Sequence, residues 1–143
     1  MKKNILFILL AVFLYSCSVE PKPIVYGDDH CHFCDMTVVD KTHASQYTTK
    51  KGKSYSFDAV ECLVRKLNQD SNEDKMAFIL VANYANPGKL VNATSATFLV
   101  SEKIKSPMGA NLSAFSTSET AKKAQSMHGG KRYTWQQIKE KLN

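Results

Sequence analysis

The sequence lacks an apolar run long enough to cross a membrane as a helix. Its longest run covers residues 5–14, ten apolar residues in a row, whereas a spanning helix needs about 20. Lys2 and Lys3 stand just before this run, and a short apolar stretch behind positive charges is typical of a cleaved secretory signal. We therefore expect the chain to be exported and not to span the membrane.

The sequence also lacks a basic stripe interleaved with aromatic residues. The formal net charge is +6, and removal of a signal that contains Lys2 and Lys3 lowers it to +4. The remaining basic residues occur in ones and twos, as at 50–51, 65–66 and 122–123. Nucleic-acid binding needs basic residues gathered on one face. The scattered charges therefore indicate a solvated surface, and we expect no nucleic-acid partner.

A cysteine follows the apolar run. Residues 14–17 read Leu-Tyr-Ser-Cys, which resembles the cleavage site of bacterial lipoproteins. We therefore predict a signal peptide over 1–16, a lipidated Cys17 with an unfolded tether over 17–25, and one folded domain over 26–143. Acyl chains would hold such a protein on a membrane of the cell envelope, facing the periplasm or the cell exterior. The alternative is an ordinary cleaved signal followed by an incidental cysteine.

Cysteine is scarce, with four residues in the chain of 143. If Cys17 carries lipid, Cys31, Cys34 and Cys62 remain, and an odd number leaves at least one thiol unpaired. Exported proteins normally pair their thiols or lack them. The unpaired thiol therefore indicates chemistry at these cysteines.

The densest group of metal-binding side chains is the hexapeptide 31–36, Cys-His-Phe-Cys-Asp-Met. It holds two thiols and a thioether, which are the soft donors that Cu(I) prefers. In an extended backbone residues i and i+2 point to the same side, which would direct the sulfurs of Cys34 and Met36 to one point. The motif predicts a soft-metal site with these two ligands, and with Cys31 and His32 as further candidates.

Other interpretations of the hexapeptide remain open. The Cys-x-x-Cys pair can be a redox pair or a structural disulfide, and Met36 can be a core residue. The disulfide interpretation predicts a bond between Cys31 and Cys34. A structural zinc site, built from the three cysteines and His30 or His32, predicts unfolding when the metal is chelated.

Apolar patterning predicts short strands between helices. A hairpin is expected from strands at 44–50 and 53–57, and the continuous apolar run at 77–82 predicts a central, buried strand. Further strands are expected at 36–39, 94–100 and 131–133.

A helix is predicted to begin at Asp58, because Asp58 and Glu61 match a capping box and an apolar stripe follows. The stripe is Val60, Leu63, Val64 and Leu67. Cys62 lies about 150° from its centre, near the first turn, where the helix dipole favours a thiolate. Cys62 is therefore a candidate ligand, with packing against the hairpin as the alternative.

Two more capping boxes and a weak repeat complete the pattern. Ser116 with Glu119 predicts a helix that ends at residue 128, and Thr134 with Gln137 predicts a last helix to residue 142. The segment Phe-Asp-x-x-Glu at 57–61 also recurs as Phe-Ser-x-x-Glu at 115–119. We therefore expect two similar β-rich halves around one core.

Met108 is the second informative sulfur. It stands between Pro107 and Gly109 in a polar loop, where a methionine has little packing to lose. We predict that it is a metal ligand, whereas Met76 and Met127 are most simply packing residues.

Together these residues resemble the NosL family of lipid-anchored copper-binding accessory proteins of nitrous-oxide reductase. The resemblance covers most of the mature chain, and Asp35 departs from the glycine common at its position. The matching residues are Cys17, 32–36, Phe57-Asp58, Glu61-Cys62-Leu63, 107–110, Phe115, 128–130 and Trp135.

The resemblance implies an α+β fold of two related ββαβ-type halves packed as one domain, the arrangement also found in organomercurial lyases. It implies Cu(I) binding at Cys34 and Met36, with Met108 matching the second-half methionine of the family. Cys31 and Cys62 would be extra thiols. The implied function is that of a Cu(I) metallochaperone, not an enzyme, with no small-molecule substrate. It would pass copper by ligand exchange to the membrane maturation machinery of nitrous-oxide reductase.

A thiol enzyme is the rival function. Besides a redox protein, it could be a carbon–mercury lyase, which needs two cooperating thiols and a carboxylate. Cys34, Cys62 and Asp58 are the candidates for those roles.

Overall fold

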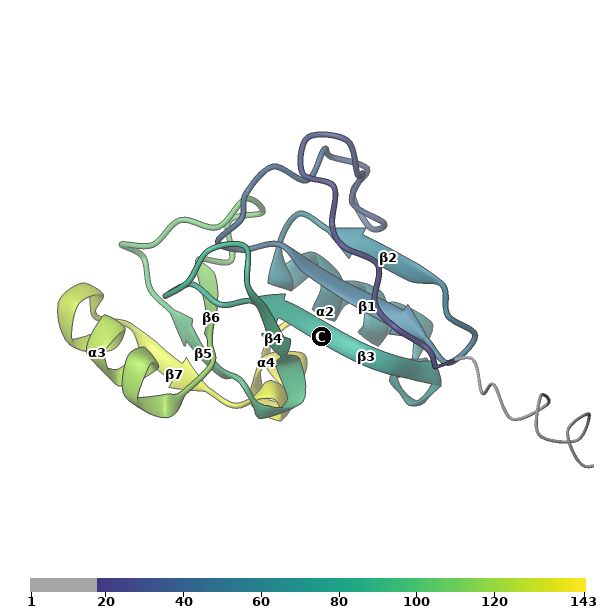
Figure 1. Cartoon of the computed structure of the whole chain (residues 1–143). Helices are drawn as coiled ribbons and strands as arrows, with labels where there is room; N and C mark the ends of the chain where they lie inside the picture. Colours follow the sequence, from purple (N-terminus) through teal and green to yellow (C-terminus); the bar gives the residue numbers. More distant parts are fainter. Residues whose placement is uncertain (1–17) are drawn as a thin grey trace, which may run out of the picture.

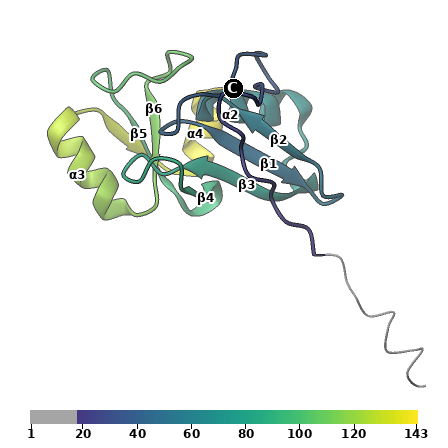
Figure 2. The ribbon, with the colours of Figure 1, turned by 45° about the horizontal axis from the view of Figure 1, so that its top comes forward.

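A computed structural model describes residues 18–143 of the chain. These residues form two small antiparallel sheets that lie side by side (Figures 1 and 2). The predicted α+β class is confirmed by this mixture of sheets and helices. The predicted signal peptide, 1–16, and Cys17 lie outside the described residues. Within 18–143, no helix has the length and apolar character needed to cross a membrane.

The first half of the fold carries a four-stranded sheet in the order β2-β1-β3-β4. Its elements are β1 (Ser45–Thr49), β2 (Ser54–Phe57), helix α2 (Val60–Asp70), the 3₁₀ helix η2 (Glu73–Lys75), β3 (Met76–Ala82) and β4 (Leu90–Asn92). The predicted hairpin and the predicted strand at 77–82 are confirmed. The sequence does not predict β4, because three residues at a sheet edge leave no periodicity to detect.

The second half carries a three-stranded sheet in the order β6-β5-β7. Its elements are the 3₁₀ helix η3 (Ala93–Ser95), β5 (Thr97–Val100), β6 (Leu112–Phe115), helix α3 (Ser118–His128), β7 (Lys131–Tyr133) and helix α4 (Trp135–Lys141). The predicted capping box of α4 is present. Strand β5 is shorter than predicted, because the Asn92 side chain accepts from the Thr94 N–H and starts η3 instead.

Both halves have the same ββαβ connection and the same strand placement. The first strand is central, the second pairs on one side of it and the third on the other. Phe57 ends β2 opposite the first residue of β1, and Phe115 ends β6 opposite the first residue of β5. In both halves the helix begins three residues after this phenylalanine. The two related halves expected from the sequence are therefore confirmed.

One core joins the halves. Phe57 and Leu63 from the first half share a buried apolar cluster with Phe98 and Trp135 from the second. Helix α2 contacts both β1 and β6, so it lies between the two sheets. Its predicted apolar stripe is fully or almost fully buried. The start of α2 is therefore enclosed by both halves of the molecule.

The predicted N-caps of α2 and α3 are wrong. Ala59, not Asp58, precedes α2, and no side chain bonds to the free amides there. The Asp58 carboxylate accepts from the Cys34 thiol instead, so a tertiary contact has replaced the local one. Helix α3 is capped by the Thr117 side chain and not by Ser116.

Candidate metal centre

Residues 28–37 form a compact loop that brings the hexapeptide to the start of α2. His30 and Thr37 pair in an isolated bridge. The Cys31 N–H donates to the Met36 carbonyl at 2.8 Å, which closes the loop from inside. Only Thr37 of the predicted strand 36–39 takes part in pairing, so that strand prediction is wrong.

Asp35 causes the loop to reverse. Its φ of +64° is in the left-handed region, and its N–H donates to the Cys31 carbonyl at 2.9 Å. Glycine adopts this conformation most easily, and aspartate is among the residues that tolerate it. Because the backbone is not extended here, the alternation that would direct Cys34 and Met36 to the same side does not apply. Cys34 is half-buried, whereas Met36 is 51% exposed.

The start of α2 supplies two donors that face this loop. Asp58 precedes the helix and Cys62 lies in its first turn; Asp58 is 2% exposed and Cys62 0%. The loop adds Cys31, which is buried, and Cys34. The four donor atoms all lie within 4.8 Å of one another.

The spacing of two sulfurs suits a shared metal ion. Cys62 Sγ lies 4.0 Å from Cys34 Sγ, and the Cys34 thiol donates to Asp58 Oδ1 at 3.5 Å. With metal–sulfur bonds of about 2.3 Å, two ligand sulfurs lie about 3.8 Å apart in a tetrahedral site and about 4.0 Å apart in a trigonal one. Cys34 and Cys62 can therefore bind one ion with little movement.

One oxygen of Asp58 lacks a partner. Its Oδ2 is buried and makes no hydrogen bond within the described chain. A buried carboxylate oxygen without a partner is costly, and a cation beside it would remove that cost. Cys31, Cys34 and Cys62 are free thiols. Three sulfurs and one carboxylate therefore fit a cation, and the sulfurs favour a soft one.

The three thiols differ in acidity. A hydrogen bond from the Cys62 thiol lowers the pKa of Cys31 from 9.0 to about 6, against the opposing effect of burial. Burial raises the pKa of Cys34 to about 11. The hydrogen bond to Cys31, together with burial, raises the pKa of Cys62. Cys31 is therefore the most acidic of the three thiols.

Met108 is tied to the cluster through Glu61. Met108 is partly buried and packs against the main core, which gives it more packing than the sequence predicts. The Ser106 hydroxyl and the Ala110 N–H both donate to Oε1 of Glu61, which is 0% exposed. Because Glu61 directly precedes Cys62, both ends of the Met108 segment are held at the first turn of α2. The ligand roles of Met36 and Met108 stay predictions.

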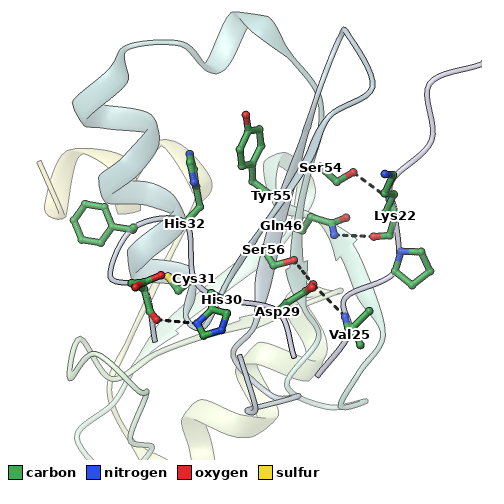
Figure 3. Close-up of a pocket in the computed structure, with 13 residues that line it drawn as sticks. Lys22, Val25, Asp29, His30, Cys31, His32, Gln46, Ser54, Tyr55 and Ser56 are labelled. Atoms are coloured by element: carbon green, nitrogen blue, oxygen red, sulfur yellow. Dashed lines mark hydrogen bonds between the residues drawn. The ribbon is translucent and has the colours of Figure 1, made fainter. Parts of the chain in front are cut away.

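His30, which precedes the hexapeptide, and His32 within it lie outside the four-donor group. His32 is exposed, and its ring stacks on Tyr55 with the ring centroids 4.2 Å apart (Figure 3). Partial burial lowers the pKa of His32. His30 Nδ1 lies 3.1 Å from the Asp35 carbonyl oxygen. Cys31 and both histidines line an open pocket of about 500 Å³ next to the cluster.

Asp58 is the donor that the predicted ligand set omits. From the sequence, Asp58 is interpreted as a helix cap or as the carboxylate of a lyase. Its spacing from Cys62 is the sequence feature that indicates a shared site, because side chains four residues apart at the start of a helix lie on the same side of it. The capping box hides this signal, because a capping carboxylate would face its own helix.

Comparison with known proteins identifies the relatives of this chain. The sequence model of the NosL family matches residues 23–143. The copper-binding lipoprotein NosL of Stutzerimonas stutzeri is 28% identical over 153 aligned positions, which cover 97% of this chain and 80% of the relative. The crystal structure of the copper chaperone NosL from Shewanella denitrificans has the same fold. Its TM-score is 0.71 at 21% identity, over 83% of this chain and 95% of the other.

Proposed function

This chain belongs to the NosL family, and on that premise we propose that it is a membrane-anchored chaperone that carries Cu(I) as its cargo. The observation that supports this most directly is the meeting of Cys31, Cys34, Cys62 and Asp58 within 4.8 Å. The relatives are named for copper binding and copper delivery, not for a catalysed reaction.

The donors suit a soft ion that binds tightly and leaves again. Cys31 and Cys62 are buried and Cys34 is half-buried, so the cluster is shielded on one side and accessible on the other. Thiolates favour Cu(I) over harder ions. The loop that carries the Met108 thioether is held at α2 by Glu61, and thioethers do not form disulfides in an oxidising compartment.

Delivery would begin at the accessible side. A sulfur of the acceptor joins the copper next to Cys34 and the exposed Met36, and the buried sulfurs are then released one at a time. Copper passes by ligand exchange and is never free. The acceptor that the family suggests is the maturation machinery of nitrous-oxide reductase.

The membrane location rests on Cys17. The relative from Stutzerimonas stutzeri is named a lipoprotein, which supports lipidation of this cysteine after removal of residues 1–16. The domain would then lie in the cell envelope, on the periplasmic or outer face of its membrane.

A competition titration tests the copper proposal. The mature wild-type protein, reduced and free of oxygen, competes with a Cu(I) chelator, and X-ray absorption reports the ligand atoms. We expect one Cu(I) per chain in a sulfur shell, and loss of this site in the variant Cys31→Ser/Cys34→Ser/Cys62→Ser. A shell of nitrogen and oxygen alone, or an unchanged affinity in the variant, would refute the proposal.

Zinc, bound as a structural ion, is the second candidate, because three cysteines and one carboxylate also satisfy a tetrahedral zinc site. Asp58 takes the place that His30 or His32 has in the sequence-based alternative. A structural zinc site requires that chelation unfolds the protein. We expect the chelated protein to keep its melting temperature, and zinc to be displaced by Cu(I).

A further inference from the structure

The predicted tether is shorter than its sequence suggests, because Lys22 is fixed to the first sheet. The Lys22 N–H donates to Ser54 Oγ at 3.1 Å, and the Gln46 side-chain amide donates to the Lys22 carbonyl at 2.7 Å. The Val25 N–H donates to Asp29 Oδ2 at 3.1 Å (Figure 3). The chain therefore leaves the domain at Lys22, not at residue 25.

The point of departure lies beside the β1–β2 hairpin turn. Ser54 is the first residue of β2 and follows the turn directly. In Figures 1 and 2 the purple segment leaves the domain next to the end of β1 and the start of β3. The Lys50 N–H donates to the Lys75 carbonyl at 2.9 Å, which joins the turn to the start of β3.

Five exposed lysines surround this point. We call them the lysine surface: Lys22, Lys50, Lys51, Lys53 and Lys75. None of them forms an ion pair within residues 18–143, where the pairs of lysine with carboxylate involve Lys66 and Lys139. The Lys53 ammonium lies over the Tyr55 ring at 4.8 Å, but no carboxylate within the described residues neutralises any of the five charges, and they can attract an anionic partner.

Four of these lysines line an open groove of about 570 Å³ whose apolar side chains are Tyr55 and Met76. Asp74 is the one acidic side chain of the groove. Apolar side chains among unpaired lysines are the composition expected of a surface that rests on lipid head groups.

We propose that the lysine surface rests on the anionic head groups of the membrane that holds the anchor. This inference depends on the proposed lipid anchor at Cys17. From Cys17 to the fixed Lys22 are five residues, which span at most about 18 Å when extended. Attraction to anionic lipid falls off within a Debye length, about 8 Å at physiological salt. The short tether holds the lysines where this attraction acts.

The contact would also orient the metal cluster. Helix α2 begins at the cluster, and the residues that follow it, Asn72 and Asp74, line the groove. Eleven helical residues span about 16 Å. With the lysine surface on the membrane, α2 would hold Cys62 and the other donors about one helix length from the groove, and the open pocket that Cys31 and Lys22 both line would lie between them. The cluster would then be open to an acceptor.

The test uses the full acylated protein on nanodiscs of phosphatidylcholine, with and without phosphatidylglycerol. A gadolinium-chelating lipid broadens the NMR signals of amides near the bilayer. We expect broadening at residues 50–53 on the anionic discs, and little at 122–123 on α3, and we expect added salt to reverse it.

Matched variants make the test decisive. Each lysine removed should lower the ratio of oriented to free domain about 5-fold, so Lys51→Gln/Lys53→Gln should lower it about 25-fold. Lys122→Gln/Lys123→Gln, with the same change of charge, should have no effect. Equal broadening in both variants, or none on anionic discs, overturns the proposed orientation. Failure of the wild type to stay on pure phosphatidylcholine discs overturns the anchor and the orientation with it, whereas the copper titration is unaffected.

Discussion

The two halves of the molecule share a strand order but differ at the start of their helices. Counted from the phenylalanine that ends the preceding strand, Asp58 corresponds to Ser116 and Cys62 to Thr120. The second half thus has hydroxyls where the first has a carboxylate and a thiol. Hydroxyls are harder and weaker ligands than thiolates for a soft ion, so the second helix start cannot replace the first.

Burial separates the two helix starts as well. Residues 60–64 of α2 are all buried, whereas the buried residues of α3 are Ala121 and Ala124. Glu61 is fully buried and its counterpart Glu119 is exposed. The ββαβ frame therefore makes no site by itself. The site arises where the second sheet and the 28–37 loop enclose one of the two helix starts.

The largest effect is expected from Cys34→Ser, which gives the first half a hydroxyl like those of the second. Cys34 contacts both Cys62 and Asp58, so its loss should weaken Cu(I) binding on the order of 100-fold or more. Competition against a Cu(I) chelator measures this. The control Thr120→Ser, in the second half, should bind as the wild type does. An unchanged affinity in Cys34→Ser would mean that copper binds elsewhere.

The buried and exposed glutamates make a second matched pair. Glu61→Ala removes the acceptor of the Ser106 and Ala110 donors and should lower the free energy of unfolding by about 2–3 kcal/mol. Glu119→Ala should change it by at most about 0.5 kcal/mol. Urea unfolding of the two variants measures the difference, and equal values would show that Glu61 does not hold the Met108 loop.

Two methionines sharpen the comparison further. Met108→Ala should lower the free energy of unfolding by about 1–2 kcal/mol, less than the ~2–5 kcal/mol of a fully buried methionine, and should weaken Cu(I) binding. Met127 on α3 is 58% exposed, so Met127→Ala should change neither quantity. Thermal melts measure the stability of both variants, and competition against a Cu(I) chelator measures their copper affinity. If Met108→Ala loses stability but keeps its copper affinity, Met108 is a packing residue only.

The last prediction is spectroscopic and concerns a thiolate that titrates in the first half. The pKa of Cys31 is lowered from 9.0 to about 6, so between these values this thiol binds fewer protons in the folded protein than in the unfolded chain. The resulting stability is present above pH 9 and lost as the pH falls through 6. Ultraviolet thiolate absorption of the metal-free protein should rise with a midpoint near pH 6, and Cys31→Ser should remove this step. Absorption that rises only near the ordinary value of 9.0 would contradict it.

The sequence predicts local features of the fold well. The hairpin that turns at Lys51-Gly52 and the box of Thr134 with Gln137 depend on residues close in the chain. The predictions for Asp58 and for strand 36–39 are wrong because the 28–37 loop makes tertiary contacts that the local sequence does not show. The Cys34 thiol donates to the carboxylate of Asp58, and only Thr37 of the predicted strand is paired, in an isolated bridge with His30.

The candidate site is predictable only in part. The three thiols can be chosen from the sequence because they are left over in an exported chain. The sequence does not show that the three thiols lie next to one carboxylate. Their position depends on the fold of the 28–37 loop over α2, and this loop conformation depends on the φ of Asp35 and on the enclosure by the second sheet. The role of Glu61 is invisible in the sequence, since its partners Ser106 and Ala110 are 45 and 49 residues away.

A domain lipidated at Cys17 and fixed at Lys22 would search for its acceptor in two dimensions. A reach of about 18 Å keeps the domain at the bilayer surface, where an acceptor in the same membrane is met at a high effective concentration. A dissolved copper scavenger is met only at its bulk concentration. In the proposed function, the hydrogen bonds of Lys22 to Ser54 and Gln46 would thus make copper transfer depend on lateral diffusion, and its rate on the number of acceptors per membrane area.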